Sequence, residues 1–388
     1  MQAPKEKPET KFLEEYCNSK LGDRFAEIKA FHEKRLWHNL TVKLLELVEQ
    51  PEMKEDNHLL RLYEEFMRTF ENKINQLSFA QIIVTIAKAH KDLNEAISFL
   101  DTMATKLSAN KESPAPYLLL RSVQAQYLLL RTETHEQAAE LLDSIEKSLE
   151  TATGIDTSVY SNFYRAKADL QKLKGRPAEY YKNAMLFLSY MNLEALPAAE
   201  KEQLAYELGL AALIGEDLYN FGDLIAHPIF ESLLGTGHEW LAHFLRAFNA
   251  GDIEKYEALV AQYNDRLSKE EGLVRNSELL KEKISILCLM ELVFNRKAMD
   301  RNIPFNVIAE ATKLPIDVVE LLIMKSLSLK LLRGQIDQLT QTVNVTWVQP
   351  RVLGMEQIST MKDRLDDWTK KVHDTLLLVE QGTPELLS

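Results

Sequence analysis

The 388-residue sequence is poor in cysteine, with Cys17 and Cys288 as its only two. Two cysteines so far apart cannot build the disulfide framework of a small secreted protein. Neither has a second cysteine or a histidine at the spacing of a zinc site. We therefore expect no disulfide, no thiolate metal centre, and a reducing compartment.

Long hydrophobic runs and an excess of positive charge are also missing. The most apolar stretch, Ile284 to Phe294, is too short to span a bilayer, and the opening segment MQAPKEKPETKFLEEY lacks the apolar run of a signal peptide. Lysine and arginine total 46 against 58 aspartates and glutamates, which gives a net charge of -12. Because this charge repels phosphate groups and anionic lipids, we expect neither nucleic acid nor a membrane as a partner.

The common signatures of catalysis are absent from the sequence. No two of the nine histidines are separated by a single residue, so the His-x-His zinc pair of a metalloprotease is missing. There is no Gly-x-Ser-x-Gly elbow and no Gly-x4-Gly-Lys phosphate loop. Adjacent acidic pairs such as Glu64 and Glu65 point about 100° apart on a helix and do not form a catalytic dyad. We predict a protein that is not an enzyme, without catalytic residues, metal ligands or a cofactor.

What the sequence does contain is helical periodicity. From Asp23 to about Ile214, amphipathic segments with a period near 3.6 residues are separated by short breaks rich in Pro, Asn, Asp, Ser or Gly. The small residues Ala125 and Ala166 fall within successive helix pairs, which suits pairs stacked on their neighbours. This pattern predicts a mainly α protein that begins as a right-handed α-solenoid of helix pairs.

The next part of the chain, residues 215–303, predicts a helical bundle. The segments Asn220-Phe221-Gly222-Asp223 and Asn249-Ala250-Gly251-Asp252 echo each other. In each we expect the glycine to end one helix in the left-handed conformation and the aspartate to cap the next. The apolar stretch from Ile284 to Phe294 is expected to form a buried helix of this bundle.

After Pro304 the pattern predicts a winged helix. A short helix from Phe305, the turn Lys313-Leu314-Pro315 and a second helix from Ile316 form a helix-turn-helix layout, and a β-hairpin follows Gly334. The second helix, IDVVELLIMKSLSLK, is apolar on nearly all sides, and the acidic and basic charges of residues 305–350 cancel. It is therefore suited to contact protein rather than to read DNA bases.

Apolar and polar residues alternate along the hairpin strand, as they do in a half-buried strand. Val343, Val345 and Trp347 are expected to point inward. Asn344 and Thr346 then point outward, beside a free strand edge that could contact a neighbouring winged helix. We predict that Asn344 and Thr346 belong to a protein interface; the alternative is that the hairpin serves only the core of its own domain.

The C-terminal segment predicts a helix with an apolar seam. Heptad a and d positions are occupied by Ile358, Met361, Leu365, Trp368, Val372 and Val379, with Thr375 as the one departure. Such a seam requires burial against a partner helix. The alternative is that the helix folds back on its own domain.

The order of helical repeats, bundle and winged helix, with FNVIAEATKLPIDVVELLIMKSLSLKLLRGQID, resembles the PCI domain. This domain is shared by the proteasome lid, the COP9 signalosome and the translation initiation factor three complex. Further stretches resemble a lid subunit, among them KRLWHNLTVKLLELV, YNFGDLIAHPIFESL, AFNAGDIEKYEAL and VTWVQPRVLGMEQISTMKDRLDDW.

The resemblance implies a non-catalytic structural subunit of the lid, which supports the degradation of ubiquitinated proteins in the cytoplasm and nucleus. Its implied partners are other lid subunits, through the winged helix and the C-terminal helix, and the ubiquitin-receptor subunit near the helical arm. The implied state is a hetero-oligomer. The alternatives are a PCI scaffold subunit of the signalosome or of initiation factor three, or a winged-helix protein that binds nucleic acid.

These readings divide the chain into six parts. They are a mobile N-terminal arm (1–20), the solenoid (21–214), the PCI helical bundle (215–303), the winged helix (304–350), the C-terminal heptad helix (355–380) and a tail (381–388).

Overall fold

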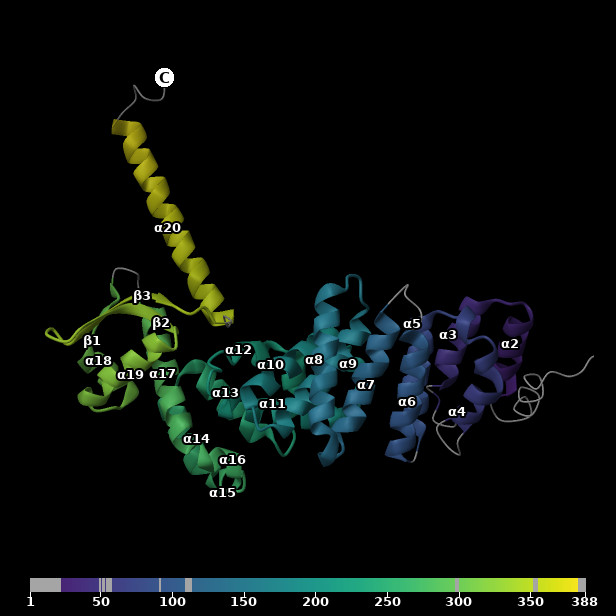
Figure 1. Cartoon of the computed structure of the whole chain (residues 1–388). Helices are drawn as coiled ribbons and strands as arrows, with labels where there is room; N and C mark the ends of the chain where they lie inside the picture. The colour runs from purple at the N-terminus through teal and green to yellow at the C-terminus, as the bar shows by residue number, and fades with distance from the viewer. Residues whose placement is uncertain are drawn as a thin grey trace, which may run out of the picture. The chain divides into compact units, whose positions relative to one another are not determined.

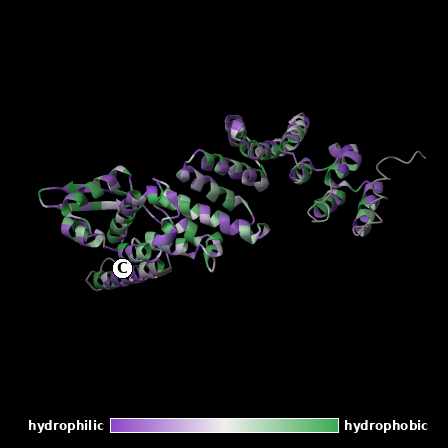
Figure 2. Cartoon of the chain, turned by 90° about the horizontal axis from the view of Figure 1, so that it is seen from below, coloured by the Kyte–Doolittle hydropathy of each residue, from purple (hydrophilic) through white to green (hydrophobic). Residues whose placement is uncertain are grey.

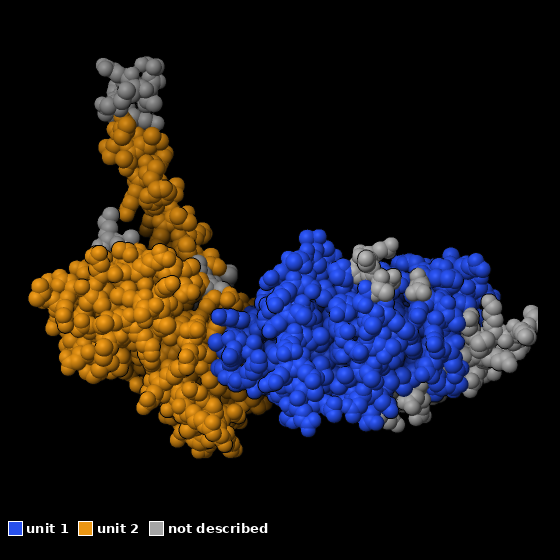
Figure 3. Space-filling view, in the orientation of Figure 1, with its two compact units in different colours: residues 1–195 blue, residues 196–388 orange. Residues whose placement is uncertain are grey.

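The computed structural model describes residues 22–48, 50, 53, 58–90, 92–108, 114–296, 300–351 and 355–382. The chain divides into two compact units, residues 1–195 and 196–388 (Figure 3). The predicted arm at residues 1–20, with Cys17, lies outside the described residues, as do residues 383–388 of the predicted tail. The domain boundaries predicted from the sequence stay a prediction.

The described part of the first unit is built from helices that follow one another along the chain (Figure 1). They are α2 (Gly22–Glu33), α3 (Trp37–Val48), α4 (His58–Arg61), α5 (Gln76–Ala89), α6 (Leu93–Ser108), α7 (Ala115–Leu129), α8 (His135–Thr151), α9 (Thr157–Leu173) and α10 (Pro177–Tyr190). Among the longer helices, α6, α8 and α9 all pack against α7, and α10 packs against α9. This is the arrangement of neighbouring helix pairs that the periodicity predicted.

Local sequence explains where these helices begin and end. Asp156 caps α9 by accepting a hydrogen bond from the Ser158 N–H at 2.8 Å. Gly175 follows α9 with φ of 68°, and Pro177 occupies the first turn of α10. Ala125 and Ala166 are fully buried, which agrees with their predicted place between helices.

The second unit contains a helical bundle, a winged helix and a long C-terminal helix. The bundle helices are α11 (Ala198–Ile214), α12 (Gly222–Ala226), a 3-10 helix (Pro228–Leu233), α13 (Glu239–Ala250), α14 (Ile253–Gln262), α15 (Asn264–Leu267), α16 (Glu271–Arg275) and α17 (Ser277–Asn295). The remaining elements are β1 (Asn302–Pro304), α18 (Phe305–Thr312), α19 (Ile316–Ser328), β2 (Leu332–Asp337), β3 (Thr342–Val348) and α20 (Met355–Gly382). The predicted apolar helix is α17, which packs against α11, α13, α18, α19 and β3.

Of the two predicted glycine stops, one is confirmed and one is wrong. Gly251 ends α13 with φ of 63°, and a Cβ there would lie 2.9 Å from the Leu287 carbonyl oxygen of α17. Asp252 then caps α14, as predicted, by accepting from the Lys255 N–H at 3.0 Å. Gly222 does not end a helix: α11 has already ended at Ile214, and Gly222 is the first residue of α12.

A buried lysine joins α17 to α11. Lys283 is 1% exposed, and its Nζ donates to the carbonyl oxygens of Ala212 (2.7 Å), Leu213 (3.1 Å) and Gly215 (2.7 Å). The last carbonyls of a helix have no partner within the helix, so the three N–H groups of one ammonium satisfy acceptors that would otherwise be buried alone. Burial lowers the pKa of Lys283 to about 7, and the nearby Asp217 opposes that shift.

The winged helix has the predicted helix-turn-helix, but its sheet has a third strand. The sheet order is β1-β3-β2, and both pairings are antiparallel. Val343 and Val345 are buried, as predicted. The strand β1 was not predicted, because three residues are too few to show an alternating pattern.

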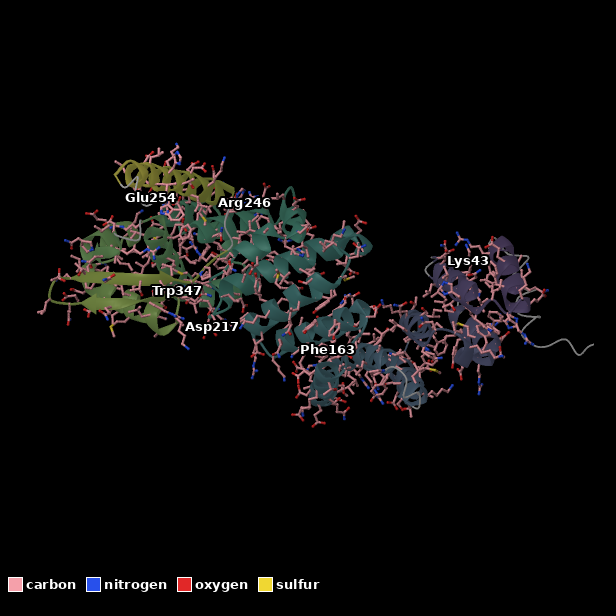
Figure 4. All side chains as sticks on the ribbon, turned by 90° about the horizontal axis from the view of Figure 1, so that it is seen from above. Lys43, Phe163, Asp217, Arg246, Glu254 and Trp347 are labelled. Atoms are coloured by element: carbon pink, nitrogen blue, oxygen red, sulfur yellow. The ribbon has the colours of Figure 1, made fainter. Side chains whose placement is uncertain are left out.

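Trp347 does not point inward, which corrects the sequence interpretation. Arg333 pairs with Trp347 and Gly334 pairs with Val345, so Thr346 is an extra residue in β3. This β-bulge breaks the alternation and leaves both Thr346 and Trp347 exposed. Trp347 is 36% exposed beside the sheet, with the Arg333 guanidinium 4.6 Å from its ring centroid (Figure 4).

We predict that Lys283→Met lowers the free energy of unfolding by about 2 to 4 kcal/mol. Three buried carbonyls lose their donor, and this loss outweighs the gain from no longer burying a charge. Chemical denaturation measures this change. Lys281→Met, at an exposed position on the same helix, is the matched control and should change stability by less than about 0.5 kcal/mol. An unchanged or increased stability of Lys283→Met would show that the hydrogen bonds do not outweigh the desolvation of the ammonium.

A second prediction concerns His227, whose Nδ1 accepts a hydrogen bond from the Ile229 N–H and so caps the 3-10 helix. Only the neutral ring can accept this bond, and burial lowers the pKa of His227 below 6.5. The unfolded chain therefore binds more protons, so this stabilising contribution is present above pH 6.5 and is lost as the pH falls through the folded pKa.

Denaturation at pH 7 and at pH 5.5 tests this dependence. His227→Asn, which can accept the same hydrogen bond without titrating, should lose less stability over this pH range than the native chain. His38→Asn, at an exposed position on α3, is the matched control substitution. An identical pH dependence in His227→Asn and the native chain would contradict the assignment.

Candidate protein-binding surfaces

The helix α20 carries the predicted seam, and the seam is exposed. Its six heptad residues are between 43% and 65% exposed: Ile358, Met361, Leu365, Trp368, Val372 and Val379. Leu376, Leu377 and Leu378 are also exposed and widen the apolar surface toward the end of the helix. Figure 2 shows hydrophobic and hydrophilic residues mixed along this helix. For these residues the alternative, in which the helix folds back on its own domain, does not describe the structure.

Buried contacts fix the chain just before α20. Arg351 forms an ion pair with Glu291 of α17, and both side chains are largely buried. Arg351 also donates to the Asn249 carbonyl oxygen of α13 at 3.2 Å. On α20 itself, Arg364 donates to the Asn295 carbonyl oxygen at 3.2 Å. Arg351 lies within WVQPRV, a segment quoted above for its resemblance, but its role depends on partners that the sequence did not reveal.

The second exposed apolar surface lies on α19, the second helix of the helix-turn-helix. Val319, Leu322 and Ile323 are buried inside the unit. Val318, Leu321 and Met324 are 40%, 63% and 52% exposed, and we call them the α19 stripe. The prediction that this helix is apolar on both sides is confirmed, and its outer side is not covered by the described residues of the unit.

The outer face of the sheet presents Asn344 and Thr346, which are exposed as predicted. The predicted free edge beside them is wrong, because β3 is the central strand. Asn344 pairs with Asn302 of β1, and the Val345 N–H donates to the Arg301 carbonyl oxygen at 3.0 Å. A partner could therefore contact this face but could not pair with the β3 backbone there.

Histidine and cysteine side chains in the described residues do not assemble into a reactive centre. Within those ranges no group of three or more His, Cys, Asp or Glu residues could hold a metal ion. His238 and His243 are each partly exposed, with acidic side chains 3.9 Å and 3.8 Å away. Burial raises the pKa of the Cys288 thiol to about 11, so it stays protonated and unreactive. Among the described helices, none has the length and apolar character needed to cross a bilayer.

Comparison with known proteins finds two family matches along the chain. Residues 24–245 match the family described as PSD13 N-terminal repeats, and residues 260–347 match the PCI domain. Helical repeats that lead into a bundle and a winged helix define a PCI-domain protein.

Individual relatives narrow the class further. The chain is 43% identical to the 26S proteasome non-ATPase regulatory subunit 13 homolog B of Arabidopsis thaliana, over 97% of this chain and 98% of that protein. It is 41% identical to the 26S proteasome non-ATPase regulatory subunit 13 of Dictyostelium discoideum, over 95% of each. The chain belongs to the family of the 26S proteasome non-ATPase regulatory subunit 13.

A more distant relative comes from one of the sister complexes. The eukaryotic translation initiation factor 3 subunit M of Coccidioides immitis is 23% identical over 72% of this chain and 59% of its own length. The proteasome relatives are closer in identity and in coverage.

Proposed function

We propose that this chain is a non-catalytic structural subunit of the regulatory lid of the 26S proteasome, where it supports the degradation of ubiquitinated proteins by holding other subunits in place. Full-length similarity to proteasome regulatory subunits supports this assignment. The observation that carries the mechanism is the exposed heptad seam of α20. The subunit works as part of a hetero-oligomer in the cytoplasm and nucleus and has no catalytic activity of its own.

The α20 seam is the principal docking surface in this proposal. Burying one large apolar side chain contributes roughly 1.5 to 3 kcal/mol. A helix that exposes six such positions is stabilised when helices of other lid subunits cover them. Polar residues such as Asp363 and Lys370 lie at the heptad positions opposite the seam, so that side of α20 can remain in water.

The winged helix is the second docking surface. The α19 stripe offers apolar contact, and the sheet face with Asn344 and Thr346 offers hydrogen-bonding groups beside it in the same domain. We propose that neighbouring lid subunits contact the winged helix through these surfaces. The helical arm in the first unit is proposed to lie near the ubiquitin-receptor subunit.

The seam is tested by Leu365→Asp combined with Trp368→Ala. Loss of two buried side chains should weaken docking roughly 10²- to 10⁴-fold, so the variant should remain folded but fail to enter the lid. Circular dichroism measures folding, and incorporation into purified lid measures docking. Asp363→Ala combined with Lys370→Ala, on the opposite side of the helix, should assemble normally.

Truncation after Gly354 separates docking from folding. A truncated chain that stays soluble and folded but does not assemble agrees with the proposal. If the truncated chain unfolds while the double variant still assembles, the seam belongs to the core of this subunit and the proposal for α20 is wrong.

The winged-helix surface is tested in the same assembly assay. Leu321→Asp places a charge at the most exposed position of the α19 stripe and should weaken incorporation about tenfold or more, whereas Asp317→Ala on the same helix should not. Asn344→Lys combined with Thr346→Lys tests the sheet face and should also weaken incorporation without loss of fold. Normal assembly of either variant set would remove that surface from the proposed interface.

A further inference from the structure

The bundle of the second unit contains a cavity of about 340 Å³ that neither docking surface uses. Its walls come from α11, α13, α14, α15, α16 and α17. The inner lining is apolar, with aromatic rings from Phe244, Phe248 and Tyr256 and aliphatic side chains from Leu273 and Leu280. These five side chains are buried in the bundle and form the floor of the cavity, while its accessible apolar surface comes from Val260, Leu267 and the 52% exposed Val274.

The aromatic floor is held in a defined geometry. The Tyr256 ring packs edge-on against Phe244 and Phe248, with centroid distances of 6.0 Å and 5.3 Å and interplanar angles of 88° and 82°. The wall formed by Leu213 is fixed as well, because its carbonyl oxygen accepts a hydrogen bond from Lys283. A cavity whose walls are already ordered loses little conformational entropy when a ligand enters.

The mouth of the cavity carries polar groups beside the exposed Val274. Exposed Asn264, Ser268 and Ser277 line the mouth, and Lys281 is the only charged residue of the lining. Deeper in, burial raises the pKa of the Tyr256 hydroxyl, which therefore stays uncharged. An apolar interior with one cation at the entrance is complementary to a molecule with an apolar body and one negative charge.

We propose that this cavity binds a small amphipathic carboxylate, with its apolar body on the aromatic floor and its carboxylate at Lys281. The volume sets the size of that body: an apolar cavity of about 150 Å³ accommodates benzene, so 340 Å³ suits a bicyclic aromatic group or a short acyl chain. The site is independent of the lid contacts proposed above, since its lining includes no residue of α19 or α20.

Calorimetric titration of the full chain with 1-naphthaleneacetate tests the site, and 1-naphthaleneacetamide is the neutral comparison ligand. We expect one molecule of 1-naphthaleneacetate to bind per chain, about threefold more tightly than 1-naphthaleneacetamide. The difference is small because an exposed ion pair contributes less than about 1 kcal/mol. Lys281→Met should abolish this preference. Lys370→Met, which removes an exposed lysine from α20, should retain it.

The location is tested by Ser277→Phe, which places a ring in the mouth of the cavity and should abolish binding of both ligands. Binding that survives Ser277→Phe, or an acetate preference that survives Lys281→Met, overturns the proposal, because the ligand then lies elsewhere, for example on the α20 seam. Absence of binding to the native chain, or equal affinity for acetate and amide, also overturns it. If Ser277→Phe lowers the melting temperature, the exposed Lys281→Met substitution decides alone.

Discussion

The contact between Lys283 and the end of α11 is the constraint on which the second unit depends. An ammonium is buried only where it is fully hydrogen-bonded, so α17 and the last carbonyls of α11 must meet in one relative position. The same helix α17 packs against α18 and α19 of the winged helix and supplies Glu291, the partner of Arg351. Both exposed apolar surfaces are thus carried by elements that α17 positions.

The two surfaces expose apolar area in different ways. In α19 one side is part of the core, so the stripe is presented by a helix that is already fixed. In α20 the residues from Ile358 to Val379 are exposed on all sides, so the seam residues differ from the rest of the helix in being apolar and not in their exposure. An acidic chain with net charge -12 can keep such surfaces in solution before assembly, since like-charged copies repel one another.

Local patterns predicted most elements, and long-range contacts account for the errors. The helices α7 to α10, the helix-turn-helix and α20 follow from periodicity. Pro177 marks the start of α10, and the Gly251-Asp252 pair marks the boundary between α13 and α14; both signals act within a few residues. Trp347 was misplaced because the bulge at Thr346 depends on pairing with β2. The partners of Lys283 and Arg351 lie far away in the sequence, and neither residue has a local signal of burial. The exposure of the six apolar residues on α20 agrees with the heptad spacing, which is itself a local pattern, and their role in docking stays a prediction.

Because the contacts of Arg351 hold the chain just before α20, a small rotation at the start of this helix displaces its far end by a larger distance. With 28 residues at 1.5 Å per residue, α20 is about 42 Å long. A rotation of about 10° near its start therefore moves its far end by about 7 Å, more than one helical turn. The hydrogen bonds of Arg351 and Arg364 act near the start of the helix, where the displacements that they must resist are small. If a partner protein bound at the far end of α20 moves, a smaller displacement reaches α13 and α17.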